Sequence, residues 1–173
     1  MEIEDTQVDW AVNQYRQSLK DKFNAKILWG SRSIYRKDWL QLREFLKEYE
    51  IKNVIEYGVG LSTELISMEG IRILSLETLD WWAEICRKAI GNEIITYVEN
   101  VLPVIDEKFD LAFVDGPQTK RTETIKHAKD HSDIIYLHDL RPEEVKLLDD
   151  WKVIEKYGQH FYTKIRVCSS CIK

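Results

Sequence analysis

A glycine-rich stretch in the first third of the chain combines residue types that can hold a ligand. An apolar run ends in the acid Glu56, Gly58 and Gly60 follow, and Ser62 and Thr63 then begin a helical pattern. This order predicts a turn between a buried strand and a helix N-terminus, where the backbone can approach a ligand closely and unpaired N–H groups point outward. The glycines could instead only shape a tight turn, but the acid before them and the helix after them favour a binding site.

A second acid, Glu77, ends the next apolar run, at residues 71–77. It follows Gly58 at close to the spacing of about 20 residues that is typical of a carboxylate holding a ribose hydroxyl. An exposed acid at a strand end is the alternative interpretation of Glu77. Together with the glycine-rich turn, the spacing predicts a site for a nucleoside-containing ligand.

Three further residues capable of acid–base chemistry follow two later apolar runs. Asp115 ends the run 109–115, His138 ends the run 133–138, and Asp139 comes directly after it. Because the carboxyl ends of parallel strands meet at one edge of a sheet, we expect these side chains to lie near the glycine-rich turn. As alternatives, Asp115 could serve only in a turn, Asp139 could cap a helix, and His138 could be structural.

The apolar runs that carry these residues alternate with amphipathic segments. We predict strands at 52–56, 71–77, 94–98, 109–115 and 133–138. We predict helices at 8–24, 36–49, 62–69, 79–90, 118–130 and 141–150. Two closing strands, 151–156 and 160–168, with Gly158 at the turn between them, fit an antiparallel hairpin at the sheet edge. The alternation predicts an α/β fold with a mostly parallel sheet.

Composition limits the class of protein. With 173 residues, 44% of them hydrophobic, the chain fits one domain, 1–173, made of a core at 36–173 and an N-terminal helical extension or lid at 1–35. The net charge of −5 argues against a nucleic-acid surface, which usually carries an excess of lysine and arginine. No apolar run approaches the roughly 20 residues that cross a bilayer. The N-terminus lacks the layout of a signal peptide, so we expect a cytoplasmic protein without a membrane partner.

Other conspicuous residues favour structural roles. Cys168 and Cys171 form a CxxC close to the end of the chain, where we predict neither a redox site nor a zinc site. We interpret Trp81 and Trp82 as packing residues, with contact to an adenine ring as the alternative. We interpret the basic residues of the predicted 118–130 helix as a solvent-exposed face. These basic residues are Lys120, Arg121, Lys126 and Lys129.

From about residue 36 to its end, the chain resembles the class I S-adenosylmethionine-dependent methyltransferases. The resemblance rests on Glu56-Tyr-Gly-Val-Gly-Leu-Ser-Thr63, Glu77, Glu99-Asn100, Phe109-Asp-Leu-Ala-Phe-Val-Asp-Gly116 and Leu137-His-Asp139. The Asp-Gly and His-Asp pairs are most similar to those of small-molecule O-methyltransferases, including some that act on sugars. The resemblance implies a Rossmann-like three-layer sandwich, with a mostly parallel sheet of about seven strands and a C-terminal antiparallel edge hairpin. It also implies methyl transfer from S-adenosylmethionine to a hydroxyl of a small molecule or saccharide.

The resemblance further implies which residues bind the cofactor. The implied residues are Glu56, Gly58, Gly60, Ser62, Thr63, Glu77, Glu99, Asn100 and Asp115. Gly58 and Gly60 would leave room for the methionine part of the cofactor, and Glu56 would contact the loop or, often through water, the methionine ammonium. Glu77 would accept hydrogen bonds from both ribose hydroxyls, for which a carboxylate has two suitably spaced oxygens.

The remaining implied contacts concern adenine and the reacting sulfonium. Asn100 falls where the family often places a residue that contacts adenine, and its neighbour Glu99 is the alternative. Both residues could instead only cap a helical turn. Asp115 would lie near the sulfonium and the incoming nucleophile.

Methyl transfer to an alcohol needs in-line approach of the acceptor and a base that removes its proton. Histidine ordinarily titrates near neutral pH, so His138 is the natural base, and Asp115 or Asp139 could orient it. Alternatively, Asp115 and Asp139, with or without His138, could bind a divalent cation that activates the acceptor. We do not favour a metal, because a third protein ligand is not obvious.

Two other classes of function stay open from the sequence. An NAD-dependent oxidoreductase is disfavoured because Thr63 stands where the dinucleotide fingerprint has its third glycine, and because little chain is left for a substrate domain. A non-catalytic module could use the same fold to bind a cofactor or a partner. The edge hairpin and exposed aromatic residues would allow a homodimer.

Overall fold

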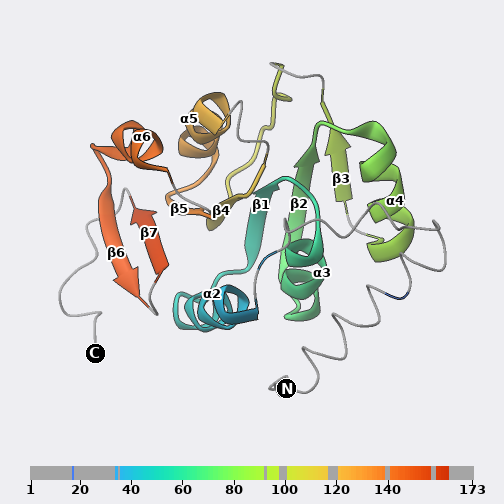
Figure 1. Ribbon diagram of the computed structural model, residues 1–173, viewed down its shortest axis with the longest axis horizontal. Helices are drawn as coiled ribbons and strands as arrows, with labels where there is room; N and C mark the ends of the chain where they lie inside the picture. The colour runs from blue at the N-terminus through green and yellow to red at the C-terminus, as the bar shows by residue number, and fades with distance from the viewer. Residues whose placement is uncertain are drawn as a thin grey trace.

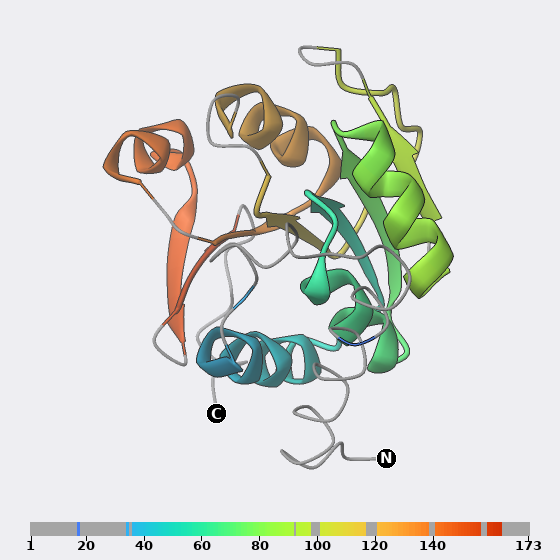
Figure 2. The same ribbon diagram turned by 45° about the vertical axis from the view of Figure 1, so that its right-hand side comes forward.

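The computed structural model describes residues 17, 34, 36–91, 93–97, 101–116, 121–138, 141–156 and 159–163 of the chain. Its centre is a seven-stranded sheet with helices on both faces, as Figures 1 and 2 show. Several sequence predictions fall outside the described residues, namely most of the helix 8–24, Gly158, Glu99, Asn100, Asp139, Cys168 and Cys171. None of the described helices combines the length and the apolar character needed to cross a membrane.

The sheet has the strand order β3-β2-β1-β4-β5-β7-β6. The strands are β1 (Asn53–Tyr57), β2 (Arg72–Glu77), β3 (Glu93–Thr96), β4 (Leu111–Val114), β5 (Ile134–Leu137), β6 (Lys152–Lys156) and β7 (Gln159–Thr163). Strands β1 to β5 run parallel, whereas β7 is antiparallel to both β5 and β6. The predicted α/β fold with a closing antiparallel pair is therefore confirmed. The strand order reverses between β1 and β4, and ligands of open α/β sheets bind outside the carboxyl ends of strands at such a point.

Helices cover both faces of the sheet. They are α2 (Arg36–Glu48), α3 (Leu61–Met68), α4 (Asp80–Ile90), α5 (Arg121–His131), α6 (Pro142–Val145) and the 3-10 helix η2 (Lys146–Leu148). On one face α2 and α3 bury a core that includes Trp39, Ile66 and Phe113. On the other face α5 and η2 bury a second core that includes Ile125 and Leu148. In Figure 2 these two groups of helices lie on opposite sides of the strands.

Two elements differ from the sequence prediction. The strand predicted at 109–115 is confined to Leu111–Val114, and Phe109 makes only an isolated bridge to Ser132. The helix predicted at 141–150 is one turn of α-helix followed by the 3-10 turn of η2. The tighter turn brings Leu148 and Trp151 into the core, and this burial of apolar surface outweighs the continued helix.

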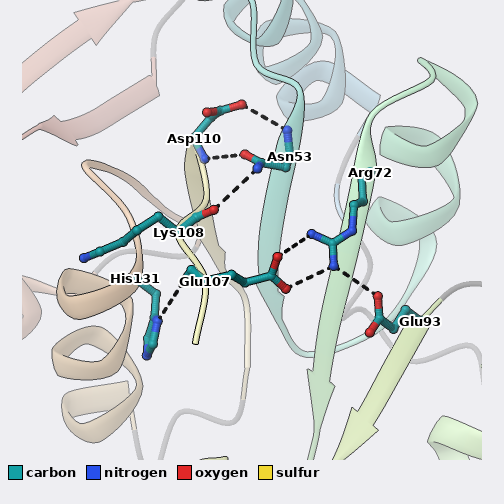
Figure 3. A network of polar contacts seen from close by, with 7 residues as sticks. All are labelled: Asn53, Arg72, Glu93, Glu107, Lys108, Asp110 and His131. Carbon is teal, nitrogen blue, oxygen red and sulfur yellow. Dashed lines mark hydrogen bonds and ion pairs between the residues drawn. The ribbon is translucent and has the colours of Figure 1, made fainter. Parts of the chain in front are cut away.

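A polar network holds the amino ends of β1, β2 and β4 together (Figure 3). Asp110 accepts hydrogen bonds from the backbone N–H groups of Lys52 and Asn53, at 2.7 and 3.1 Å, and its own N–H donates to the Asn53 side chain. Arg72 forms a two-point ion pair with Glu107, at 2.8 and 3.0 Å. This network lies at the amino ends of the strands, whereas the glycine-rich turn lies at their carboxyl ends. It therefore anchors the strands without taking part in that turn.

The buried side chain of Arg121, at the start of α5, contacts the end of β4, the end of β5 and α6. Its guanidinium donates to the backbone carbonyls of Val114, at 3.2 Å, and of His138, and its Nε lies 3.1 Å from a carboxylate oxygen of Glu144. The side chains of Arg121 and Glu144 are only 3% and 5% exposed. The interpretation of Arg121 as part of a solvent-exposed basic face is therefore wrong. Helical spacing alone could not reveal that this position faces the ends of β4 and β5.

We predict that Arg121→Met lowers the free energy of unfolding by about 3–5 kcal/mol, because it leaves the Glu144 carboxylate buried without its partner. Lys126→Met removes an exposed positive charge from the same helix, and we expect it to change stability by no more than about 0.5 kcal/mol. Denaturant titration of both variants measures the difference. Equal stabilities of the two variants would contradict a structural role for the buried pair.

Candidate active site

The glycine-rich turn between β1 and α3 is built on a close backbone contact. Gly58 has a φ of +95°, which residues with a side chain rarely adopt. A Cβ there would lie 3.0 Å from the Cα of Gly116. Gly58 is therefore required both by its conformation and by the space available. At Gly60, by contrast, a Cβ would meet no atom within 4 Å. The turn is thus tight against β4 at its first glycine and open at its second.

Glu56 lies beneath this turn as a fully buried carboxylate. It accepts hydrogen bonds from Ser62 and Thr63, both at 2.5 Å, and from Ser75 at 2.7 Å. Burial, with a smaller contribution from the nearby charge of Asp115, raises its pKa to about 7 against the lowering effect of these donors. The carboxylate therefore holds the start of α3 against β1 and β2.

Ser62 and Thr63 help to hold the start of α3 in place. Both side chains are buried and donate to Glu56, and Thr63 also accepts a hydrogen bond from the N–H of Gly60 at 2.9 Å. Glu56 contacts the residues of the turn directly, which is one of the two roles that the resemblance implied for it. Direct contact of Glu56, Ser62 or Thr63 with a cofactor stays a prediction.

Glu77 ends β2 and faces the same turn. One of its carboxylate oxygens accepts a hydrogen bond from the N–H of Val59 at 3.2 Å, and the other accepts from the N–H groups of Thr78 and Leu79 at 2.7 and 3.0 Å. Trp82 of α4 donates from its indole nitrogen to the carbonyl of Val59 at 2.8 Å. Val59 is therefore held on both sides, and Glu77 is oriented at the rim of the turn.

The two tryptophans at the start of α4 have different surroundings. Trp82 packs against the buried cluster of Val59 and Ala83, in agreement with a packing role. Trp81 is 54% exposed. Its indole contacts that of Trp82 edge to face, with ring centroids 5.9 Å apart, so Trp81 is much less well packed than Trp82.

A second cluster joins β4, β5 and α2. His138, directly after β5, has its Nδ1 2.9 Å from Oδ1 of Asp115, directly after β4. Its Nε2 lies 3.4 Å from Oδ2 of Asp38 in the first turn of α2. The imidazole therefore lies between two carboxylates. The structure brings two of the three predicted catalytic residues into contact, whereas the third, Asp139, lies outside the described residues.

The two clusters lie next to each other. Asp115 immediately precedes Gly116, whose backbone contacts Gly58, and the charge of Asp115 acts on Glu56. The turn and the histidine cluster therefore share the carboxyl edge of the sheet, at the reversal of strand order. Among the described residues, no group of three or more His, Cys, Asp or Glu side chains has an arrangement that could hold a metal ion.

Sequence reasoning missed two acids near this edge. Asp38 looked like an ordinary acidic residue in the first turn of a helix, and nothing in its local pattern pointed to His138. Glu64 in the first turn of α3 has a pKa raised to about 7 by burial, and its Oε2 is a buried atom without a hydrogen-bond partner among the described residues. Only the packing of α2 and α3 against the sheet reveals either position.

No protein-family model matches the sequence, and no curated protein is significantly similar to it. Solved structures are similar in fold. An O-methyltransferase from Bacillus cereus in complex with SAH is 14% identical, with a TM-score of 0.63 over 93% of this chain and 92% of that one.

Two further solved structures agree with this likeness. The O-methyltransferase TomG from Streptomyces achromogenes, involved in tomaymycin synthesis and solved with SAM, is 12% identical, with a TM-score of 0.57 over 88% and 87% of the two chains. The SAH-bound methyltransferase PaMTH1 from Podospora anserina is 17% identical, with a TM-score of 0.56 over 89% and 86%. The chain therefore has the fold of the class I S-adenosylmethionine-dependent methyltransferases.

Proposed function

We propose that this protein binds S-adenosylmethionine and transfers its methyl group to a hydroxyl of a small molecule or saccharide. The observation that carries the proposal is the hydrogen-bonded Asp115–His138 pair, which lies beside the glycine-rich turn on a methyltransferase fold. Two of the solved structures with this fold are named as O-methyltransferases, and the ligands in their complexes are SAM or SAH. Position and chemistry of the pair thus support a base next to a cofactor site.

The residues of the turn fit the cofactor. Gly60 leaves open space where a side chain would otherwise stand, so the backbone can be approached closely. Glu77 is 6% exposed and is oriented beside the turn by backbone N–H groups, and each of its oxygens has a further lone pair that can accept a hydrogen bond from a ribose hydroxyl. When bound, the cofactor supplies an electrophilic methyl group. The chain itself orients the reactants and removes the acceptor proton.

His138 and Asp115 are proposed to supply the base. In this role a neutral His138 carries its proton on Nδ1 and donates it to Asp115, 2.9 Å away, which leaves the lone pair on Nε2. This is the arrangement of a general base whose second nitrogen is held by a carboxylate. The proposed base chemistry needs no metal.

We predict that the purified protein binds S-adenosylmethionine and that Glu77→Ala weakens binding by about 100-fold, since hydrogen bonds to a charged group are each worth about 1.5–3 kcal/mol. Glu84→Ala, which removes an exposed acid from α4, is the matched control and should bind like the wild type. Calorimetric titration, with NAD as a second titrant, measures both affinities. Absence of binding in folded protein, or preference for NAD, would reject the proposed cofactor.

We predict that His138→Ala and Asp115→Ala each reduce methyl transfer by about 100- to 10,000-fold, the usual contribution of a general base, while binding of S-adenosylmethionine is retained. Transfer of labelled methyl groups to a panel of catechols, phenols and sugars measures the rate. Asp106→Ala removes an exposed acid next to Glu107 of the amino-end network and controls for loss of charge. Wild-type turnover in either active-site variant would exclude the pair as the base.

The raised pKa of Glu56 makes the stability of the turn depend on pH. A carboxyl group with a pKa of about 7 in the folded state and about 4.5 when unfolded stabilises the fold fully below about pH 4.5. This contribution is lost as the pH rises through about 7, because the folded state then has to hold a buried charge. The folded protein binds the proton of Glu56 more tightly than the unfolded chain does, and this difference is the source of the stability at low pH.

We therefore predict that wild type loses about 3 kcal/mol of stability relative to Glu56→Gln between pH 4.5 and pH 7.5, because glutamine stays neutral throughout. Denaturant titrations at several pH values give the difference between the two proteins. Glu44→Gln, on the exposed side of α2, should follow the wild type across the same range. A constant difference between wild type and Glu56→Gln would contradict the raised pKa.

A further inference from the structure

The side chain of His138, the proposed base, is largely shielded from solvent. The His138 side chain is only 6% exposed, and its Nε2 is among the buried polar atoms. The carboxylates on its two sides, Asp115 and Asp38, are 20% and 21% exposed. An acceptor that approaches this cluster therefore meets a carboxylate before it can meet the imidazole.

The two nitrogens of His138 are not equivalent. Nδ1 lies 2.9 Å from Asp115, at hydrogen-bond distance, whereas Nε2 lies 3.4 Å from Asp38, and we therefore assign the proton of the neutral ring to Nδ1. Nε2 then has the lone pair, and it faces Asp38 at 3.4 Å. A proton that arrives at Nε2 must therefore come from the side of the ring on which Asp38 lies.

We propose that Asp38 is a catalytic residue that receives the acceptor's proton and passes it to Nε2 of His138. This inference rests on the proposed function and adds a residue to the same site. As the acceptor oxygen forms its bond to the methyl carbon, the bond from that carbon to sulfur breaks and its electron pair stays on sulfur. The acceptor O–H bond breaks at the same time, its proton goes to Oδ2 of Asp38, and from there it moves to Nε2.

The relay gives a buried imidazole access to a substrate. An isolated carboxylate, with an ordinary pKa of about 4, is a weak base for a hydroxyl, whereas an imidazole titrates at about 6.5 and retains the proton. Asp115 stabilises the resulting imidazolium through the Nδ1–H bond. Asp38, which is partly exposed, thus lets a substrate transfer its proton to the buried His138.

The first test compares Asp38→Asn with Asp38→Glu and with the control Glu44→Gln, which removes a charge from the exposed side of the same helix. The acceptor is the hydroxyl compound of the catechol, phenol and sugar panel that wild type methylates fastest. We expect Asp38→Asn to lower kcat by at least about 100-fold with little change in the KM for S-adenosylmethionine, Asp38→Glu to restore part of kcat, and Glu44→Gln to match wild type. Wild-type kcat in folded Asp38→Asn would overturn the proposal.

The second test needs no acceptor and separates failure of this inference from failure of the proposed function. Long-range ¹H–¹⁵N NMR of the ¹⁵N-labelled protein resolves the ring nitrogens of its four histidines, and His138→Gln assigns the signals of His138. We expect Asp38→Asn to shift the Nε2 signal strongly and Asp115→Asn to act mainly on Nδ1, while Glu44→Gln changes neither. An Nε2 signal that is the same in wild type and Asp38→Asn would show that the two groups share no proton, and would reject the relay even if the protein is a methyltransferase.

Discussion

The close approach of two glycines at the reversal of strand order is the constraint on which the site depends. A Cβ on Gly58 would meet the backbone of Gly116 at 3.0 Å, and one on Gly116 would meet the carbonyl of Tyr57 at 3.1 Å. Side chains at these positions would push β4 away from the end of β1. Since Asp115 precedes Gly116, the same contact sets the distance between the glycine-rich turn and the histidine cluster. The proposed cofactor site and the proposed base are therefore positioned by one backbone contact.

The turn itself depends on a buried acid that costs stability. Glu56 is fully buried, and three hydroxyl donors offset only part of the loss of hydration, as its raised pKa indicates. An apolar residue would cost less there, but it could not hold Ser62, Thr63 and Ser75 at once. A charged acceptor binds several donors in fixed directions, which defines the path of the chain into α3. Precision at the turn is thus obtained at the expense of stability.

The sequence was sufficient for the fold and for most of the cluster at the carboxyl edge, but not for contacts made by distant helices. Apolar runs of strand length, alternating with amphipathic segments, predicted the five parallel strands closely, because buried parallel strands have an uninterrupted apolar pattern. Strand ends likewise pointed to Asp115 and His138, whose contact follows from the order of β4 and β5. Asp38 and Arg121 could not be placed in this way. The rotation of α2 and α5 about their axes, which brings both residues to the strand ends, is decided by packing and not by local pattern.

The polar groups of the two sheet edges differ in a way that explains where chemistry can occur. At the amino ends of the strands Arg72, Glu107 and Asp110 are paired with one another or with the backbone. The arginine is about half exposed, so these ions cost little free energy. At the carboxyl edge His138 lies buried between two acids, and its carbonyl is held by the buried Arg121. The imidazole that we propose as the base can exchange protons with these carboxylates only if the surrounding backbone keeps the groups in line. The Arg121–Glu144 pair therefore acts on the site as well as on the fold, because it fixes the ends of β4 and β5 from which Asp115 and His138 project.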